Sequence, residues 1–221
     1  EIAFAAFCTR ASVKDFQLDS CGAQINLYDR LEVSFAKQDF DVDPLSLTLS
    51  QKIIGLKLRL YGDLVYSTWP QLSLGIQQKT LDTTDIAFAL GAHDDKGTDV
   101  YLAASKLHLG MVAGYNLLWN VSLRYTEANE MGLLGFGGPK GNGSINTEMS
   151  VALLLNKNIA VGVEYREKPD NLGLKESNWR DVFVAWFPNK HINLTLAYVD
   201  LGAIAAIPDQ TGWYISLSGQ Y

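Results

Sequence analysis

The sequence contains no long run of apolar residues, and its charges are few and scattered. The longest apolar runs are about six residues, whereas a membrane-spanning helix needs about 20, so a helical membrane protein is excluded. Charged residues make up 19 % of the chain. This is less than in typical soluble domains and indicates that part of the surface does not meet water. The net charge of -6 comes without basic clusters, and we therefore expect no nucleic-acid partner.

Signatures of catalysis and metal binding are also missing. Two cysteines are too few for a metal-binding or multi-disulfide framework, and the three histidines lie far apart in the chain. There is no nucleophile elbow, HExxH motif, phosphate-binding loop or dinucleotide fingerprint. We therefore predict that the protein is not an enzyme and has no cofactor and no metal ion. No signal peptide opens the sequence, so we expect a mature or truncated chain.

What the sequence does contain is a period of two. Apolar residues alternate with polar or small ones, for example in 117–125 and 192–198, as in strands with one apolar and one polar face. All six prolines fall between such segments or at a segment's first residue, where a missing backbone donor does least harm. We predict about twelve strands, with ten or fourteen as alternatives, in one domain over residues 1–221. The predicted strands are 1–11, 15–27, 31–40, 47–61, 70–80, 98–109, 114–127, 146–156, 158–167, 178–187, 191–200 and 211–221; no helix is predicted.

The connections between these segments alternate in length. Short ones such as 28–30, 156–158 and 188–190 alternate with long polar ones such as 128–145. Short periplasmic turns and long extracellular loops are typical of bacterial outer-membrane barrels. The predicted fold class is therefore all-β, an antiparallel transmembrane β-barrel in a bacterial outer membrane, surrounded by outer-membrane lipid. A β-sandwich would also alternate in polarity, but it gives no reason for connections that alternate in length by side.

The pairing of neighbouring strands can be tested at the tight turns. A turn centred on Asp29 keeps apolar residues opposite apolar residues on one face, and a turn centred on Lys157 does the same. A turn centred on Asn189 would place Val184 opposite Leu194, again matching apolar residues.

The first predicted hairpin brings the two cysteines together. Its register places Cys8 opposite Cys21, with Lys37 beside Cys21 on the next strand. The pair forms either a cross-strand disulfide in an oxidising compartment or two reduced thiols in a packed surface.

The polar face of the strands predicts the lining of a lumen. Its ionisable members are Lys57, Arg59, Lys106, His108, Arg124, Glu148, Glu164, Arg166 and Asp181. Basic residues on earlier strands would face acidic residues on later ones, a charged lining of the kind that sets ion preference in a pore. Alternatively these groups pair with one another, Glu148 with Arg166 for example, and fill a narrow barrel.

Two further segments carry specific expectations. The loop LLGFGGPKGNGS at 133–144 either folds into the barrel mouth or stays a mobile loop. Its apolar residues favour packing, since they would otherwise sit in water. The closing strand GWYISLSGQY should pair with the first strand to close the barrel, with Ile215 and Leu217 facing outward and Ser216, Ser218 and Gln220 facing the lumen.

Several stretches resemble a family of proteobacterial outer-membrane proteins known only as a domain of unknown function. They are LYDRLEVSFAKQDFDV, LLGFGG, EYREKPDNLG, DVFVAWFPNKH and DQTGWYISL. The resemblance covers nearly the whole chain. It implies the location and the fold, and it supplies no activity and no catalytic residue.

Together these observations favour a narrow porin-like channel for small polar solutes or ions. The alternative is a structural barrel, plugged by its own side chains, that anchors or contacts partners in a larger envelope complex. A homo-oligomer or an envelope-protein partner is compatible with both.

Overall fold

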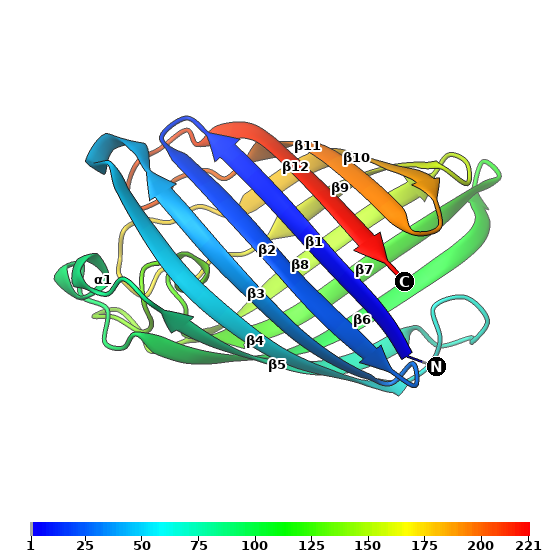
Figure 1. Ribbon diagram of the computed structural model, residues 1–221, viewed down its shortest axis with the longest axis horizontal. Coiled ribbons are helices and arrows are strands. Elements are labelled where there is room, and N and C mark those ends of the chain that lie inside the picture. Colours follow the sequence, from blue (N-terminus) through cyan, green and yellow to red (C-terminus); the bar gives the residue numbers. More distant parts are fainter. Residues whose placement is uncertain (1) are drawn as a thin grey trace.

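The period of two in the sequence becomes a closed antiparallel barrel of twelve strands in the computed structural model, which describes residues 2–221 (Figure 1). Each strand pairs with its neighbours in sequence, and β1 pairs with β12 to close the sheet. The strands are β1 Ile2–Val13, β2 Phe16–Leu27, β3 Leu31–Val42, β4 Leu47–Tyr61, β5 Gln71–Leu81, β6 Lys96–Val112, β7 Tyr115–Thr126, β8 Ser144–Leu154, β9 Ile159–Arg166, β10 Trp179–Asn189, β11 Ile192–Asp200 and β12 Thr211–Gln220. The predicted fold class, all-β with twelve strands, is confirmed.

The two ends of the barrel differ in their connections. The connections at 28–30, 62–70, 113–114, 155–158 and 190–191 lie at one end, here called the turn end. Both chain termini lie at the turn end, and α1 lies at the opposite end (Figure 1). This opposite end, here called the loop end, carries the connections at 14–15, 43–46, 82–95, 127–143, 167–178 and 201–210.

The helical content is small, but it is not zero as the sequence had suggested. One short helix, α1 Asp85–Ala89, lies in the loop at 82–95, and two 3-10 turns lie at Asp43–Leu45 and Glu130–Gly132. A helix of five residues is too short to show the 3.6-residue period by which a helix is recognised in sequence. Among residues 2–221, no helix is long and apolar enough to cross a membrane.

The predicted registers hold at two of the three tight turns. Ile25 pairs with Val33 across the turn at 28–30, and the register across 155–158 is also as predicted. The prediction for β10 and β11 is wrong by two residues, because Val184 pairs with Leu196 instead of Leu194. The turn lies at 190–191 and not at the predicted 188–190, which offsets the register by three residues, and an irregularity between Trp186 and Asn189 reduces the offset to two. A shift of two leaves each side chain on its original face.

The cysteine pair forms a disulfide. Cys8 of β1 and Cys21 of β2 are directly opposite in the register and are bonded through their sulfurs. They lie on the outward face with Lys37, which pairs with Cys21 in the register and whose ammonium lies 2.9 Å from the Asp39 carboxylate. The disulfide therefore staples two neighbouring strands on the outside of the barrel.

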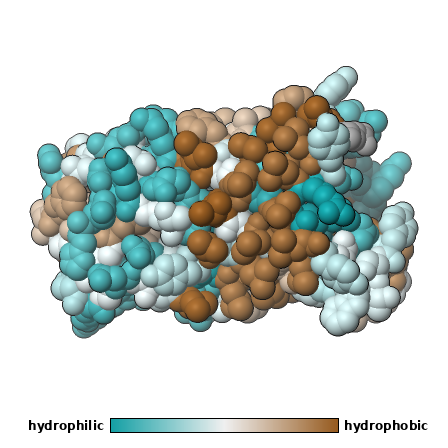
Figure 2. Space-filling view, turned by 90° about the horizontal axis from the view of Figure 1, so that it is seen from below, coloured by the Kyte–Doolittle hydropathy of each residue, from teal (hydrophilic) through white to brown (hydrophobic). Residues whose placement is uncertain are grey.

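The outward face carries a band of exposed apolar side chains. Figure 2 shows this band in brown, with hydrophilic surface on either side of it. Ile215 and Leu217 of β12 are about half exposed, at 48 % and 55 %. Ser216, between them, lies on the lumen face and its hydroxyl is 2.8 Å from that of Thr9. Both outward assignments for β12 are confirmed, and an apolar band of this kind is what a lipid-facing barrel presents.

Candidate functional site: the barrel lumen

One half of the lumen is filled by a network of charged side chains. The network crosses β5 to β9 and consists of Lys79, Asp99, Arg124, Glu148 and Arg166. Lys79 and Arg124 lie 2.8 Å and 3.3 Å from the Asp99 carboxylate. Arg124 and Arg166 lie 2.9 Å and 2.6 Å from the Glu148 carboxylate. Basic and acidic groups alternate along this chain, so each buried charge has a partner of opposite sign.

Two more predicted lining residues lie on the same side of the barrel. Lys57 of β4 is 3.5 Å from Glu32 of β3, and Arg59 is 3.3 Å from Asp63 in the 62–70 connection. Backbone amides of residues 65 and 66 donate to Asp63 and hold the pKa of this carboxyl below its usual value. These cations are therefore paired rather than free to act on a passing ion.

The prediction that Lys106 and His108 line the lumen is wrong. Asp99 and Tyr101 of β6 face inward, and alternation along the strand puts Lys106 and His108 on the outward face. Lys106 pairs with outward-facing Trp119, and its ammonium donates to the carbonyls of residues 63, 65 and 67. The indole of Trp119 donates to His108 Nε2 at 3.0 Å. The 62–70 connection thus covers Lys106 on the outside of the barrel.

The other half of the lumen holds a row of cavities. A cavity of about 470 Å³ lies next to the loop end. A second cavity, of about 390 Å³, lies next to the first on the side of the turn end. The two share Ser150, Glu164, Asp181 and Tyr214 in their linings. The second in turn shares Leu154, Phe187 and Asn193 with a cavity of about 640 Å³ at the turn end. The shared lining residues make these three cavities neighbours in a row that follows β8 to β12.

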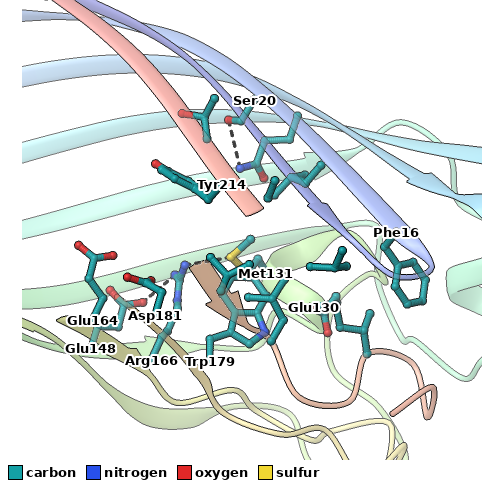
Figure 3. A pocket seen from close by; sticks show the side chains of 18 of the residues that line it. Phe16, Ser20, Glu130, Met131, Glu148, Glu164, Arg166, Trp179, Asp181 and Tyr214 are labelled. Atoms are coloured by element: carbon teal, nitrogen blue, oxygen red, sulfur yellow. Dashed lines mark hydrogen bonds and ion pairs between the residues drawn. The ribbon is translucent and has the colours of Figure 1, made fainter. Parts of the chain in front are cut away.

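Two carboxylates stand where the first two cavities meet. Glu164 of β9 and Asp181 of β10 are directly opposite in the register. Figure 3 shows both beside Glu148 and Arg166 on one side of the first cavity. Among residues 2–221 neither carboxylate forms an ion pair, because Arg166 is engaged by Glu148. Of the predicted lining residues, the structure therefore brings together Glu148, Glu164, Arg166 and Asp181 around the first cavity.

The loop at 127–143 lies across the loop end of the barrel and lines the first cavity. The Met131 carbonyl accepts hydrogen bonds from Lys79 Nζ at 3.0 Å and from Gln51 Nε2 at 3.3 Å. The Met131 sulfur accepts a hydrogen bond from the Arg166 guanidinium at 2.9 Å. Leu133 and Leu134 pack into an apolar cluster with inward-facing residues of β2 to β4 and with Ile204. The predicted folding of this loop into the mouth is confirmed, and we call residues 127–143 the plug.

A buried ion cluster fastens the plug to two other loops. Lys168 Nζ lies 2.9 Å from Glu130 of the plug and 2.7 Å from Glu176. The same ammonium donates to the Ala203 carbonyl, and Glu176 accepts from the backbone amide of Ala205. Burial raises the pKa of Glu130 to about 8, with Lys168 opposing the shift and Glu176 adding to it. Two carboxylates sharing one ammonium favour a proton on one of them. We call Glu130, Lys168 and Glu176 the latch.

Sequence reasoning missed several residues that decide this arrangement. Lys79 and Asp99 could have been found, since they share the inward parity of Gln77 and Tyr101. The latch could not, because its three members lie on loops that carry no periodicity.

The comparisons with known proteins agree with this geometry. A family described as "Protein of unknown function (DUF3034)" matches residues 1–218. No curated protein is similar to the chain in sequence.

The KdgM porin has 8 % identity and a TM-score of 0.59, with 98 % of this chain and 99 % of that chain covered. The NanC porin has 8 % identity and a TM-score of 0.57, with 99 % and 98 % covered. The COG4313 outer membrane channel from Pseudomonas putida F1 has 13 % identity and a TM-score of 0.54, with 99 % and 94 % covered. The shared feature is the outer-membrane β-barrel fold.

Proposed function

The chain belongs to the DUF3034 family, and we propose that it is a narrow porin-like channel for small polar solutes or ions in a bacterial outer membrane. The turn end would face the periplasm and the loop end the outside. The conducting path is the row of cavities along β8 to β12, and the plug holds it closed in the conformation described above. No covalent chemistry is part of this function.

The observation that carries the proposal is the division of the lumen into two halves. The charged network and its paired neighbours occupy one half, while three cavities with shared walls run along the other from the plug to the turn end. A barrel that served only as a solid anchor would have no reason to keep one half hollow, since empty space forfeits packing contacts. Likeness in fold to porins and to an outer-membrane channel is in keeping with this proposal.

The test is the conductance of the purified protein in a planar bilayer. We expect low conductance for the unmodified chain and clearly larger unitary conductance when residues 131–141 of the plug are replaced by a short Gly-Ser linker. Leu45→Ser, at an exposed loop-end position with 64 % exposure, is the matched control and should conduct like the unmodified chain. A shortened-plug variant that folds, as shown by heat-modifiable migration on SDS gels, but conducts no ions would contradict the proposal.

One observation favours a second candidate function, a structural barrel that contacts partners. The apolar cluster at the loop end contains Phe16, Phe40, Leu49 and Leu133, all nearly inaccessible, so the plug packs against the barrel wall as in a protein core. An envelope-protein partner or a second copy would then bind the outward face. Shortened-plug variants without conductance would support this second candidate.

A further inference from the structure

The cavity below the plug has two chemically different walls. Side chains from β1 to β3 form one wall, which is mostly apolar through residues such as Phe7, Leu18 and Phe40 but also carries Thr9, Ser20 and Gln38. The opposite wall contains Glu164 and Asp181 from β9 and β10. The labelled residues in Figure 3 show Phe16 on one side of the cavity and Glu164 and Asp181 on the other. A solute that fits the cavity must therefore satisfy both an apolar and an acidic surface.

The acidic wall is only partly balanced from within the protein, because Arg166 also lines the cavity. The Arg166 guanidinium is held by Glu148 and by the sulfur of Met131, and Lys168 is held inside the latch. Asp181 has one carboxylate oxygen that is inaccessible and that accepts no hydrogen bond from the described residues. Because this oxygen is enclosed by protein, a solute in the cavity meets the rest of the Asp181 side chain together with Glu164.

We propose that this cavity binds an organic cation with one ammonium group and an apolar body, such as an alkyl or aromatic amine. The proposal rests on the proposed function, because the solute reaches the cavity along the open path from the turn end. The ammonium lies between Glu164 and Asp181, and the apolar body lies against Phe7, Leu18 and Phe40.

Other classes of solute fit less well. An anion would meet two carboxylates without a free cation beside them. A small inorganic cation would satisfy the carboxylates but leave the apolar wall in contact with water, which is unfavourable. A neutral apolar compound would leave both carboxylates without a counter-charge. The cavity volume of about 470 Å³ lies within the range of about 300–1,000 Å³ that small-molecule sites occupy.

Isothermal titration calorimetry of the full chain in nanodiscs tests the proposal. The probes are 2-phenylethylammonium, the neutral 2-phenylethanol with nearly the same body, and methylammonium with the charge alone. We expect 2-phenylethylammonium to bind at least about tenfold more tightly than either comparison probe. Equal affinity for 2-phenylethylammonium and 2-phenylethanol, or for 2-phenylethylammonium and methylammonium, would overturn the proposal.

Variants identify the site. The double variant Glu164→Gln/Asp181→Asn should weaken binding of 2-phenylethylammonium at least about tenfold. The control Glu32→Gln/Lys57→Gln, which removes an ion pair from the lumen face without changing the net charge, should leave it unchanged. Phe7→Ala tests the other wall and should weaken 2-phenylethylammonium while leaving methylammonium unaffected. Unchanged binding in both cavity variants would overturn the proposal.

This experiment is separate from the conductance test. Binding is measured on the unmodified, closed chain and needs no opening of the plug. Binding that depends on both walls, without conductance in the shortened-plug variant, would contradict the channel and leave the cavity assignment standing. Conductance without such binding would contradict the cavity assignment and leave the channel proposal standing.

Discussion

The ammonium of Lys168 lies 2.9 Å from the carboxylate of Glu130, and both side chains are almost completely buried. Glu130 belongs to the plug and Lys168 to the loop at 167–178, so this contact joins two loops that are far apart in sequence. Lys168 also contacts Glu176 and the carbonyl of Ala203, and three loops therefore meet at one cation. This cluster therefore ties the plug to the two neighbouring loops.

The latch makes closure of the plug dependent on pH. The pKa of Glu130 rises from 4.5 to about 8 when the plug is closed, so the closed state binds a proton that an open, hydrated plug releases. Closure is then fully favoured below pH 4.5, weakens as pH rises through this window and is weakest above about 8. We expect conductance to increase several-fold from about pH 5 to about pH 9, measured in planar bilayers.

Glu130→Gln should abolish this pH dependence. The amide stays neutral at every pH, so the variant is expected to remain closed under alkaline conditions. Glu127→Gln is the control, because Glu127 lies on the same loop but contacts Tyr125 instead of the latch. A pH response that survives unchanged in Glu130→Gln would show that another group controls closure.

The second prediction concerns the packing of Phe136, in the plug, against Gly97 of β6. A Cβ added at Gly97 would come within 2.1 Å of the Phe136 ring, which is 1 % exposed. Gly97→Ala should therefore displace the ring, destabilise the plug by about 1–3 kcal/mol and raise conductance. Gly219→Ala is the matched control, since its Cβ would meet only the His191 carbonyl at 3.8 Å. Equal conductance in the two alanine variants would argue against this contact as part of the closure.

The third prediction concerns ion preference. In the shortened-plug background, Glu164 and Asp181 face the path without a counter-charge, so the channel should prefer cations. Glu164→Gln/Asp181→Asn should move the reversal potential in a salt gradient toward zero. Neutralising Lys57 together with Glu32 should change it little, because these two groups pair in the filled half. A larger shift from the Lys57 pair would mean that ions pass on the other side of the lumen.

The fourth prediction concerns the disulfide. Cys8 and Cys21 are separated by 13 positions in the chain, and closing a loop of that size stabilises a folded protein by about 3 kcal/mol in the chain-entropy description. The variant Cys8→Ser/Cys21→Ser should therefore unfold at a lower urea concentration, while its circular dichroism spectrum remains that of a β-barrel. A reducing agent should lower the urea concentration at which half of the unmodified chain is unfolded. It should leave this urea concentration unchanged for the double variant. If the oxidised chain and the double variant unfolded at the same urea concentration, the disulfide would contribute nothing measurable to stability.

The strands were predictable because their information is local. Alternation along one strand determines which side chains share a face, and the tight turn at Asp29 fixed the register of its hairpin. Lys106 was misplaced although the local signal was available, since Leu102 and Ala104 have the same parity and face outward. The register of β10 and β11 was misread because the turn lies at 190–191, and the irregularity beside Trp186 was not readable because it leaves no mark on the alternation.

The sequence by itself determined a barrel with an apolar outside, a polar inside, paired cysteines and alternating turns and loops. Only the tertiary structure decided which lumen charges pair, which half stays hollow and how the plug is held. The physical reason is distance. Alternation acts between residues that are neighbours on a strand, whereas Met131 meets Lys79 and Arg166, and Glu130 meets Lys168, only after the sheet has closed and the loops have folded across its mouth.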